Sequence, residues 1–302
     1  MLHYALVRGW VGPEVNDVLE GWGEFAREHL LDDTAAPRRG SQDYSGVRLY
    51  DSPWLARFFV ERFRWNHNVE DLELSARILE RASELGIGRF LAIGSSEAFM
   101  TVARELESAG QLDRAQRLRD EILRSADHFI SLGTDLPGHE VAYEQAMVAP
   151  LINLLIDAHR ISGHSSLLQE IETRLPWLLA FSGPQPHARL NGVAIRHWDG
   201  YWFGLRRQWG DVFPHYWSAL TSTVLARLPE ALRTTNTDRL STTILRANMT
   251  NYFADGSATC AFVFPTAVDG AAAHTADPLA NDQDWHLTLW MELAEEGVAP
   301  LR

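Results

Sequence analysis

The chain has 302 residues, 46% of them hydrophobic, so it can bury a substantial core without help from disulfides or metals. Its formal net charge of -13 at pH 7 disfavours nucleic acid as a partner, because phosphate binding relies on clustered cations. All 27 basic residues are Arg, a bias that a GC-rich genome produces and that says nothing about the ligand.

The N-terminus, MLHYALVRGWVGPE, lacks the basic and apolar segments of a signal peptide. No stretch approaches the roughly 18 uninterrupted apolar residues of a membrane span. We therefore expect a soluble, cytoplasmic chain with no membrane partner, although the abrupt start also fits a domain of a longer protein. Cys260 is the one cysteine, and we expect it to be a small buried apolar residue.

Apolar residues recur at helical spacing from about residue 15 to residue 187, and strand-like alternation is scarce, so the sequence predicts an all-α fold. Several predicted helices end at a glycine, where a left-handed cap is expected: Gly86, Gly110, Gly133 and Gly163. After residue 187 the segment 191–211 is rich in Gly and aromatic residues and predicts a long structured loop, a frequent place for function. The predicted helices span residues 15–30, 53–66, 69–86, 97–110, 112–133, 141–163, 165–183, 214–228, 237–253 and 284–296.

Weak self-similarity links three segments, in each of which a short polar turn lies between a helix end and a helix of similar pattern. They are residues 64–86, 107–133 and 160–183. A spacing of about 45 to 55 residues predicts roughly six helical hairpins, arranged as an open solenoid or closed into an (α/α)6 toroid. No linker or low-complexity run divides the chain, so we predict one domain over residues 1–302.

The block GDVFPHYWS predicts a helix start, because Pro214 suits the first helical turn, where its missing N–H costs nothing. Asp211 would then precede the helix, and His215, Tyr216 and Trp217 would lie in its first turn. A helix N-terminus carries unpaired N–H groups and partial positive charge, which suits a sugar carboxylate. The alternative is that Asp211 only caps the helix while His215 and Tyr216 satisfy buried hydrogen bonds.

The block IRHWDGYWFG combines flat aromatic rings with polar and charged groups. Aromatic faces can stack on the C–H face of a pyranose ring while polar groups fix its orientation. Four of the eleven Trp residues lie in residues 197–218, which favours a site, although ordinary core packing stays the alternative for any single Trp. The candidate stacking residues are Trp198, Tyr201 and Trp202, and the polar ones are Arg196, His197 and Asp199.

Two further segments carry carboxylates. Glu140 and Glu144 are four residues apart and share a helix face; Glu144, just before an apolar run, is the better cleft candidate, whereas Glu140 suits a solvated helix start. Near the C-terminus, Asp282 or Asp284 can cap the last helix, close to His286. No HExxH or comparable ligand spacing occurs, so we expect neither a metal site nor a cofactor.

Together, HEVAYEQAMVAP, RHWDGYWFG, GDVFPHYWS and NDQDWHL, set in a helical-hairpin pattern over about residues 51–290, resemble the six-hairpin glycosidase superfamily. The resemblance implies an (α/α)6 toroid, or an incomplete version of it, and carbohydrate chemistry. Members include hydrolases of glucuronyl and unsaturated glucuronyl residues, and polysaccharide lyases share the toroid. The bond that is broken is not identified, since one fold hosts many functions.

The preferred reaction is hydrolysis of a uronic-acid-containing oligosaccharide or polysaccharide, because the best clusters contain carboxylates. One carboxylic acid would protonate the leaving oxygen while a second carboxylate activates water. Asp211 and Glu144 are the leading pair, with Asp199 in reserve. Arg196 or Arg206 would hold the uronate carboxylate in a bidentate clamp.

Three alternatives remain open. A lyase would use His215 with Tyr216 or Tyr201 for proton transfer, and Asn191 with Arg196 to neutralise the uronate carboxylate. A toroidal sugar epimerase would use paired His residues as acid and base. A non-catalytic helical-repeat scaffold would carry no convergent carboxylates. The sequence indicates no oligomeric state.

Overall fold

The computed structural model describes residues 1–41, 45–138, 145–180, 201–202, 208–215, 217–259, 261–268, 275–276 and 284–297. Contacts divide the chain into two compact units. Unit 1 holds Met1–Ala142 and Asn153–Leu167, and unit 2 holds Tyr143–Ile152 and Leu168–Arg302. The single domain expected from the sequence stays a prediction.

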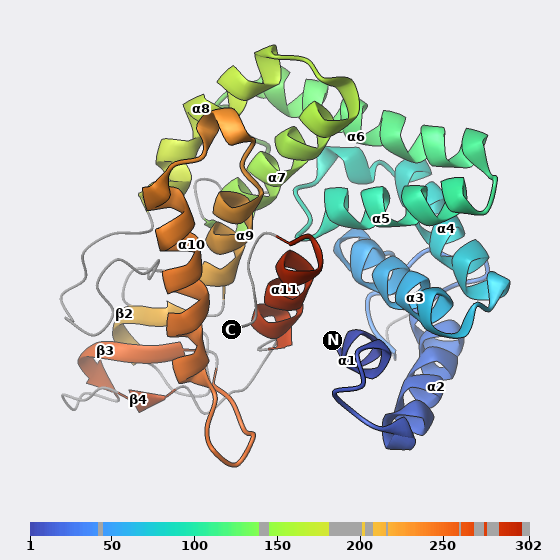
Figure 1. Ribbon diagram of the computed structural model, residues 1–302, viewed down its shortest axis with the longest axis horizontal. Coiled ribbons are helices and arrows are strands. Elements are labelled where there is room, and N and C mark those ends of the chain that lie inside the picture. The colour runs from blue at the N-terminus through green and yellow to red at the C-terminus, as the bar shows by residue number, and fades with distance from the viewer. Residues whose placement is uncertain are drawn as a thin grey trace. The chain divides into compact units, whose positions relative to one another are not determined.

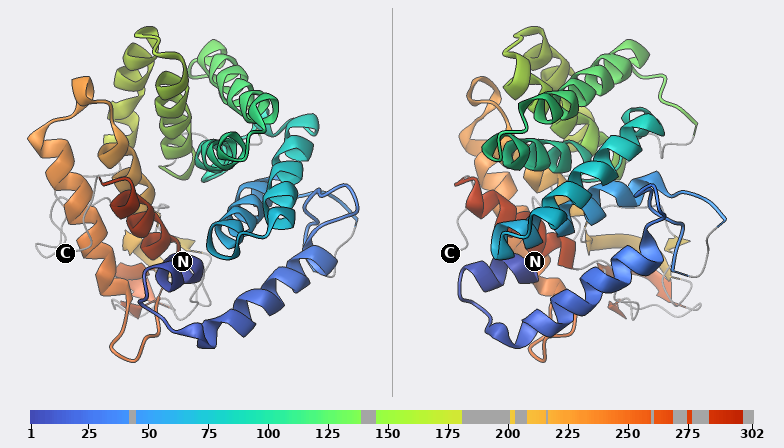
Figure 2. Two further views of the ribbon diagram at one scale, coloured as in Figure 1. Left: turned by 45° about the vertical axis from the view of Figure 1, so that its right-hand side comes forward. Right: turned by 90° about the vertical axis from the view of Figure 1, so that its right-hand side faces the viewer.

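Unit 1 is built from helices that pack as hairpins (Figures 1 and 2). Helix α3 packs on α4 and α5, and α5 packs on α6, as the repeated polar turns of the sequence predict. Each helix buries one apolar face, as the recurring helical spacing requires. The elements are α1 (Leu2–Val7), η1 (Pro13–Val15), α2 (Asn16–Phe25), η2 (Ala26–Leu30), η3 (Leu49–Asp51), α3 (Ser52–Asn66), α4 (Val69–Glu84), η4 (Ile87–Arg89), α5 (Ser95–Ser108) and α6 (Leu112–Leu132).

The four predicted helix-ending glycines all have positive φ, from 59° at Gly133 to 89° at Gly86. A residue with a side chain is strained in that region, whereas glycine adopts it freely, so these positions end the helices where the sequence predicts. At the other end of α4, the Asn68 side chain accepts a hydrogen bond from the Glu70 backbone N–H at 3.1 Å.

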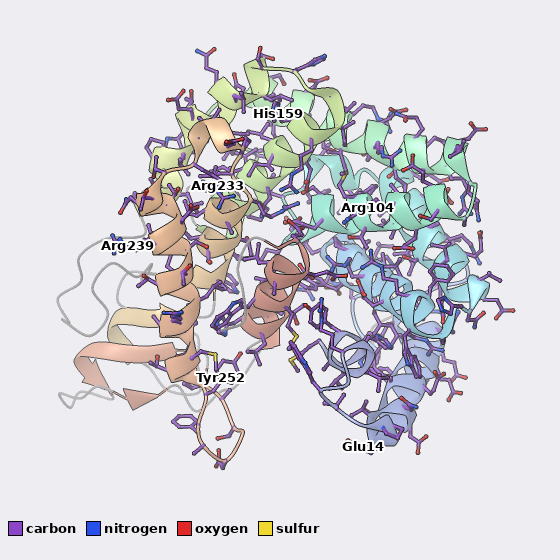
Figure 3. All side chains as sticks on the ribbon, in the orientation of Figure 1. Glu14, Arg104, His159, Arg233, Arg239 and Tyr252 are labelled. Atoms are coloured by element: carbon purple, nitrogen blue, oxygen red, sulfur yellow. The ribbon has the colours of Figure 1, made fainter. Side chains whose placement is uncertain are left out.

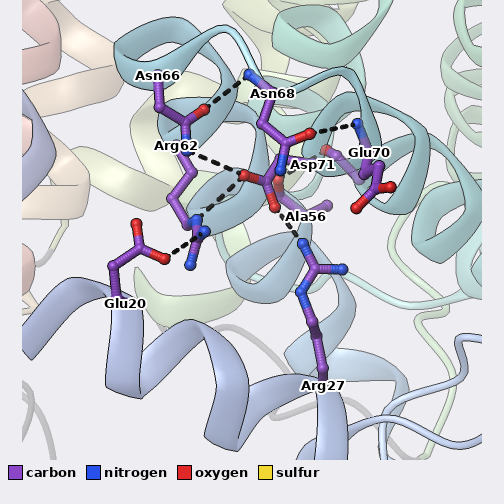
Figure 4. Close-up of polar contacts among 9 residues, drawn as sticks. Glu20, Arg27, Ala56, Arg62, Asn66, Asn68, Glu70 and Asp71 are labelled. Carbon is purple, nitrogen blue, oxygen red and sulfur yellow. Dashed lines mark hydrogen bonds and ion pairs between the residues drawn. The ribbon is translucent and has the colours of Figure 1, made fainter. Parts of the chain in front are cut away.

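A buried ionic network ties α2, η2, α3 and α4 together (Figure 4). The Asp71 carboxylate is fully buried and accepts hydrogen bonds from Arg27, from Arg62 Nε at 3.1 Å and from Asn66 at 3.4 Å. Arg62 also donates to Glu20 on α2 at 2.8 Å. A carboxylate without water is tolerated only when cations and donors surround it, so these contacts fix how the elements meet.

Unit 2 centres on α9 (Ser218–Arg227), in which every residue is buried. Helix α9 packs on α10 (Thr235–Asn248) and on α11 (Asp284–Glu295). Ser222 and Ser241 join α9 to α10 by reciprocal bonds, each hydroxyl donating to the other residue's carbonyl at 2.9 and 3.0 Å. The other helices beyond α6 are α7 (Gln145–Ser162) and α8 (Ser166–Leu179), whose residues fall partly in each unit, with η6 (Glu230–Leu232) and η7 (Met249–Asn251) in unit 2.

Unit 2 also contains a small antiparallel sheet that the sequence did not predict, with strand order β1-β2-β3-β4. Strands β2, β3 and β4 are labelled in Figure 1. The strands are β1 (Tyr201–Trp202), β2 (Gln208–His215), β3 (Ala261–Val268) and β4 (Thr275–Ala276). The sheet is minor beside the helices, and the predicted all-α class is confirmed. Among the described residues, no helix has both the length and the apolar character needed to cross a bilayer.

The prediction of a helix from Pro214 is wrong at its start. Asp211 and His215 lie in β2, and α9 begins at Ser218. Pairing of Val212 with Val263 and of His215 with Ala261 leaves one extra residue on β2, a bulge that contains Pro214. A bulge tolerates a residue without an N–H, so proline here marks an irregular strand rather than a first helical turn.

Candidate active site

The predicted site residues divide into two groups. Five lie in described segments of unit 2: Tyr201 and Trp202 on β1, Asp211 and His215 on β2, and Trp217 immediately before α9. The remainder lie outside the described residues: Glu144, Asn191, Arg196, His197, Trp198, Asp199, Arg206 and Tyr216, together with Glu140 and Asp282.

Strand pairing brings the two aromatic blocks of the sequence together. Tyr201 pairs with Trp209, and Trp202 pairs with Gln208, so β1 lies directly beside the first half of β2. Asp211 lies two residues beyond Trp209 on that strand. The sequence predicts that these blocks share one site, and the backbone places Tyr201, Trp202 and Asp211 on neighbouring strands.

The second neighbour of β2 is β3, in which Phe264 pairs with Asp211 and Ala261 with His215. Sequence reasoning missed this strand, although its apolar, β-branched sequence AFVFPTAV is a usable signal. Candidate residues Asp211 and His215 therefore lie on a central strand of the sheet. Among the described residues, β1 pairs only with Gln208 and Trp209 of this strand, so Asp211 and His215 are held in the ladder by β3.

The start of α9 differs from the expected arrangement. Trp217 is the N-cap residue, its carbonyl accepts from the Leu220 N–H at 3.0 Å, and its own side chain makes no capping hydrogen bond. Asp211 lies six residues before Trp217, on β2, and so is not the N-cap residue of α9. Trp217 is half-buried, and the next residue, Ser218, is fully buried.

Two buried polar residues that the sequence analysis missed support this junction. Asn248, at the end of α10, is fully buried and donates from Nδ2 to Ser218 Oγ at 2.6 Å and to the Ile244 carbonyl at 3.0 Å. Asn251, in η7, is 1% exposed and donates to Asn248 Oδ1 at 3.5 Å. Two Asn residues three apart at the end of a predicted helix are a weak signal, because Asn is also common at helix ends.

His286 on α11 is a buried structural residue. Its Nε2 lies 2.8 Å from the Leu245 carbonyl, which can only accept, so Nε2 carries the proton. Burial lowers the pKa of His286 from 6.5 to about 4, so the ring is neutral at pH 7. The ring lies 5.7 Å from the rings of Tyr252, labelled in Figure 3, and Trp290. Within the described segments, no three His, Cys, Asp or Glu residues are grouped as metal ligands.

Comparison with known proteins shows which fold this is. No protein-family model matches the sequence, and no curated protein matches it. A solved polysaccharide lyase is 32% identical, with a TM-score of 0.86 over 97% of this chain and 44% of the lyase chain. This chain therefore spans less than half of the lyase's length.

Two structures of an α-1,6-mannanase, GH76A from Salegentibacter sp. HEL1_6, are more distant matches. One is 11% identical, with a TM-score of 0.52 over 76% of this chain and 69% of the mannanase. The other, an inactive variant in complex with α-1,6-mannotetrose, is 12% identical, with a TM-score of 0.54 over 80% and 73% of the two chains. The chain thus has an all-α fold of the α/α-toroid type found in the six-hairpin glycosidase superfamily.

Proposed function

We propose that this chain acts as a carbohydrate-active enzyme that cleaves a uronic-acid-containing polysaccharide by β-elimination. The observation that carries the proposal is the 32% identity to a polysaccharide lyase over 97% of this chain. The sequence alone favoured hydrolysis. We now prefer β-elimination, because the lyase is 32% identical to this chain, whereas the mannanases, which are hydrolases, are only 11% and 12% identical.

β-Elimination requires three functions around one uronate ring. A base removes the C5 proton, a double bond forms between C4 and C5, and the C4–O4 bond breaks with its electron pair moving to O4. An acid then protonates the leaving oxygen. The substrate carboxylate must be neutralised by donors or a cation, because negative charge builds up on it as the C5 proton leaves.

The candidate residues supply all three functions. His215 and Tyr216, or Tyr201 in place of Tyr216, are proposed for the two proton transfers. Asn191 and Arg196 are proposed to neutralise the carboxylate. Tyr216, the sequence neighbour of His215, is the first choice of the two tyrosines, because Tyr201 pairs with Trp209, six residues before His215 and about 20 Å from it along the strand.

Hydrolysis is the second candidate, favoured by the carboxylates in the same blocks. Asp211 and Glu144 would act as general acid and base, with Asp199 in reserve and Arg196 or Arg206 holding the uronate. A water oxygen would then join the anomeric carbon, and the leaving oxygen would receive the proton. The two reactions leave different products, which makes them separable.

The chain is incubated with defined uronate polymers, and the products are followed by ultraviolet absorbance and mass. β-Elimination gives an unsaturated uronate that absorbs in the ultraviolet, with no mass gain from water. Hydrolysis gives saturated ends that are heavier by one water per cut. Cleavage without an unsaturated product would overturn the lyase and leave the hydrolase, and the absence of cleavage on every uronate polymer would overturn both.

Variants then test the residue roles. If the chain is a lyase, His215→Gln and Tyr216→Phe should each lower kcat by on the order of 10² to 10⁴, the usual contribution of a positioned acid or base. Tyr50→Phe, in unit 1 and outside the candidate site, is the matched control and should retain full activity. A large loss in Asp211→Asn and Glu144→Gln, with His215→Gln active, would favour hydrolysis instead.

A further inference from the structure

A chain of buried hydrogen bonds holds the end of β2 that carries the candidate residues. Its members are Ser218, Asn248, Asn251 and Thr259, each no more than 1% exposed. Asn248 Nδ2 donates to Ser218 Oγ at 2.6 Å, and Asn251 donates to Asn248 Oδ1 at 3.5 Å. The Thr259 N–H donates to the Asn251 carbonyl at 2.8 Å.

The two ends of this chain flank one pair of residues in the sheet. His215 on β2 pairs with Ala261 on β3. Ser218 follows His215 by three residues, and Thr259 precedes Ala261 by two. The segment that follows β2 is therefore bonded through Ser218 to the Asn248 side chain, and the segment that precedes β3 is bonded through Thr259 to the Asn251 backbone carbonyl. The two Asn side chains are bonded to each other.

Neighbouring elements restrict the junction further. Both α10 and η7, which carry Asn248 and Asn251, contact β2. A second bond from Asn248 Nδ2 to the Ile244 carbonyl at 3.0 Å fixes the amide on its own helix. A fully buried amide held by several partners has one orientation, because each lost hydrogen bond would leave a polar group without water.

We infer that Asn248 and Asn251 form a clamp that holds the backbone where β2 ends at His215 and where α9 begins at Trp217, and so positions this junction for the proposed cleavage. Neither Asn touches substrate in this proposal; both are positioning residues, which act through Ser218 and Thr259. The inference rests on the proposed function, since His215 is a candidate for proton transfer. Reacting groups need placement to within an ångström, so loosening this junction should reduce turnover.

The test compares Asn248→Ala and Ser218→Ala with a matched control, Ser222→Ala. Ser222 lies one turn further along the same helix, is equally buried, and loses its contacts with the Ser241 carbonyl and hydroxyl at 2.9 Å. All three variants remove buried hydrogen bonds between α9 and α10, but only the first two act on the junction with β2. Circular dichroism establishes that each variant is folded at the assay temperature.

Activity is measured as kcat and KM on the polymer that wild type cleaves. Asn248→Ala and Ser218→Ala should each lose at least about tenfold in kcat/KM, mostly in kcat, while Ser222→Ala stays within about twofold. The double variant Ser218→Ala with Asn248→Ala should lose little more than either single change, because both break one contact. Equal losses in all three single variants, or none in Asn248→Ala, would refute the clamp.

Hydrogen exchange provides a readout that needs no substrate. Asn248→Ala should speed amide exchange in peptides covering residues 208–218 and 259–268, and Ser222→Ala should leave these peptides unchanged. If wild type cleaves no uronate polymer, the proposed function fails, but hydrogen exchange still tests the clamp. Unchanged amide protection of both segments in Asn248→Ala would overturn the clamp, whatever the activity of the protein.

Discussion

His286 is a titratable side chain that the fold keeps neutral. Burial lowers its pKa from 6.5 to about 4, so the unfolded chain takes up a proton at a higher pH than the folded one. The free energy of unfolding therefore falls as pH drops from 6.5 to 4. Above pH 6.5 the ring is neutral in both states, so His286 makes no pH-dependent contribution to it. Fully developed, the loss is about 3 kcal/mol.

His286→Gln should remove this pH dependence while keeping a donor for the Leu245 carbonyl. We expect a variant that is slightly less stable than wild type at pH 7 and that loses about 3 kcal/mol less on going to pH 4. Urea unfolding at a series of pH values measures this difference. His164→Gln, at an exposed position, is the control and should follow wild type. Parallel curves for wild type and His286→Gln would show that His286 does not resist protonation.

At the level of helices, α2 and α3 approach each other where glycine leaves room for a cation. A Cβ on Gly23 would lie 2.0 Å from Arg62 Nη1, and Arg62 is a buried member of the Asp71 network. Gly23→Ala should therefore destabilise the fold by about 1–3 kcal/mol, as overpacking does. On the same helix, Gly21 is exposed with nothing within 4 Å, so Gly21→Ala should stabilise by up to about 1 kcal/mol. Thermal unfolding of the two variants provides the comparison, and shifts of the same sign would contradict it.

The helices were predictable because each follows from local signals. Apolar periodicity and the glycines at 86, 110, 133 and 163 placed helices α2 to α8 within a few residues, whereas α1 (Leu2–Val7) was not predicted. The sheet was not predictable in this way, because β2 and β3 pair across some fifty residues and no local signal records a partner so distant. Pro214 led to the wrong prediction of a helix start, because proline suits both a first helical turn and a β-bulge. Only the pairing of β2 with β3 decides between the two.

For the candidate site, the sequence predicted which residues have suitable chemistry, and the fold showed which strands carry them and which strands are neighbours. Tyr201, Asp211 and His215 were chosen for their chemistry, and strand pairing then placed them on adjacent strands. Asn248 and Asn251 were not predicted as site residues, because two Asn residues near a helix end are only a weak signal and do not reveal burial. The role of Asn248 depends on Ser218, thirty residues away. Positioning residues of this kind are found from the structure.

For the whole molecule, the net charge of -13 predicts how a uronate polymer would be captured. Both partners are anionic, so long-range repulsion should slow their encounter at low salt, where the Debye length is about 30 Å at 0.01 M. Raising ionic strength to 0.15 M shortens that length to about 8 Å and should increase kcat/KM several-fold. The methyl-esterified form of the same polymer lacks the charge and should show little salt dependence. Stopped-time assays on both polymers measure this, and a kcat/KM that falls with salt would mean that a cationic cleft, rather than the net charge, governs association.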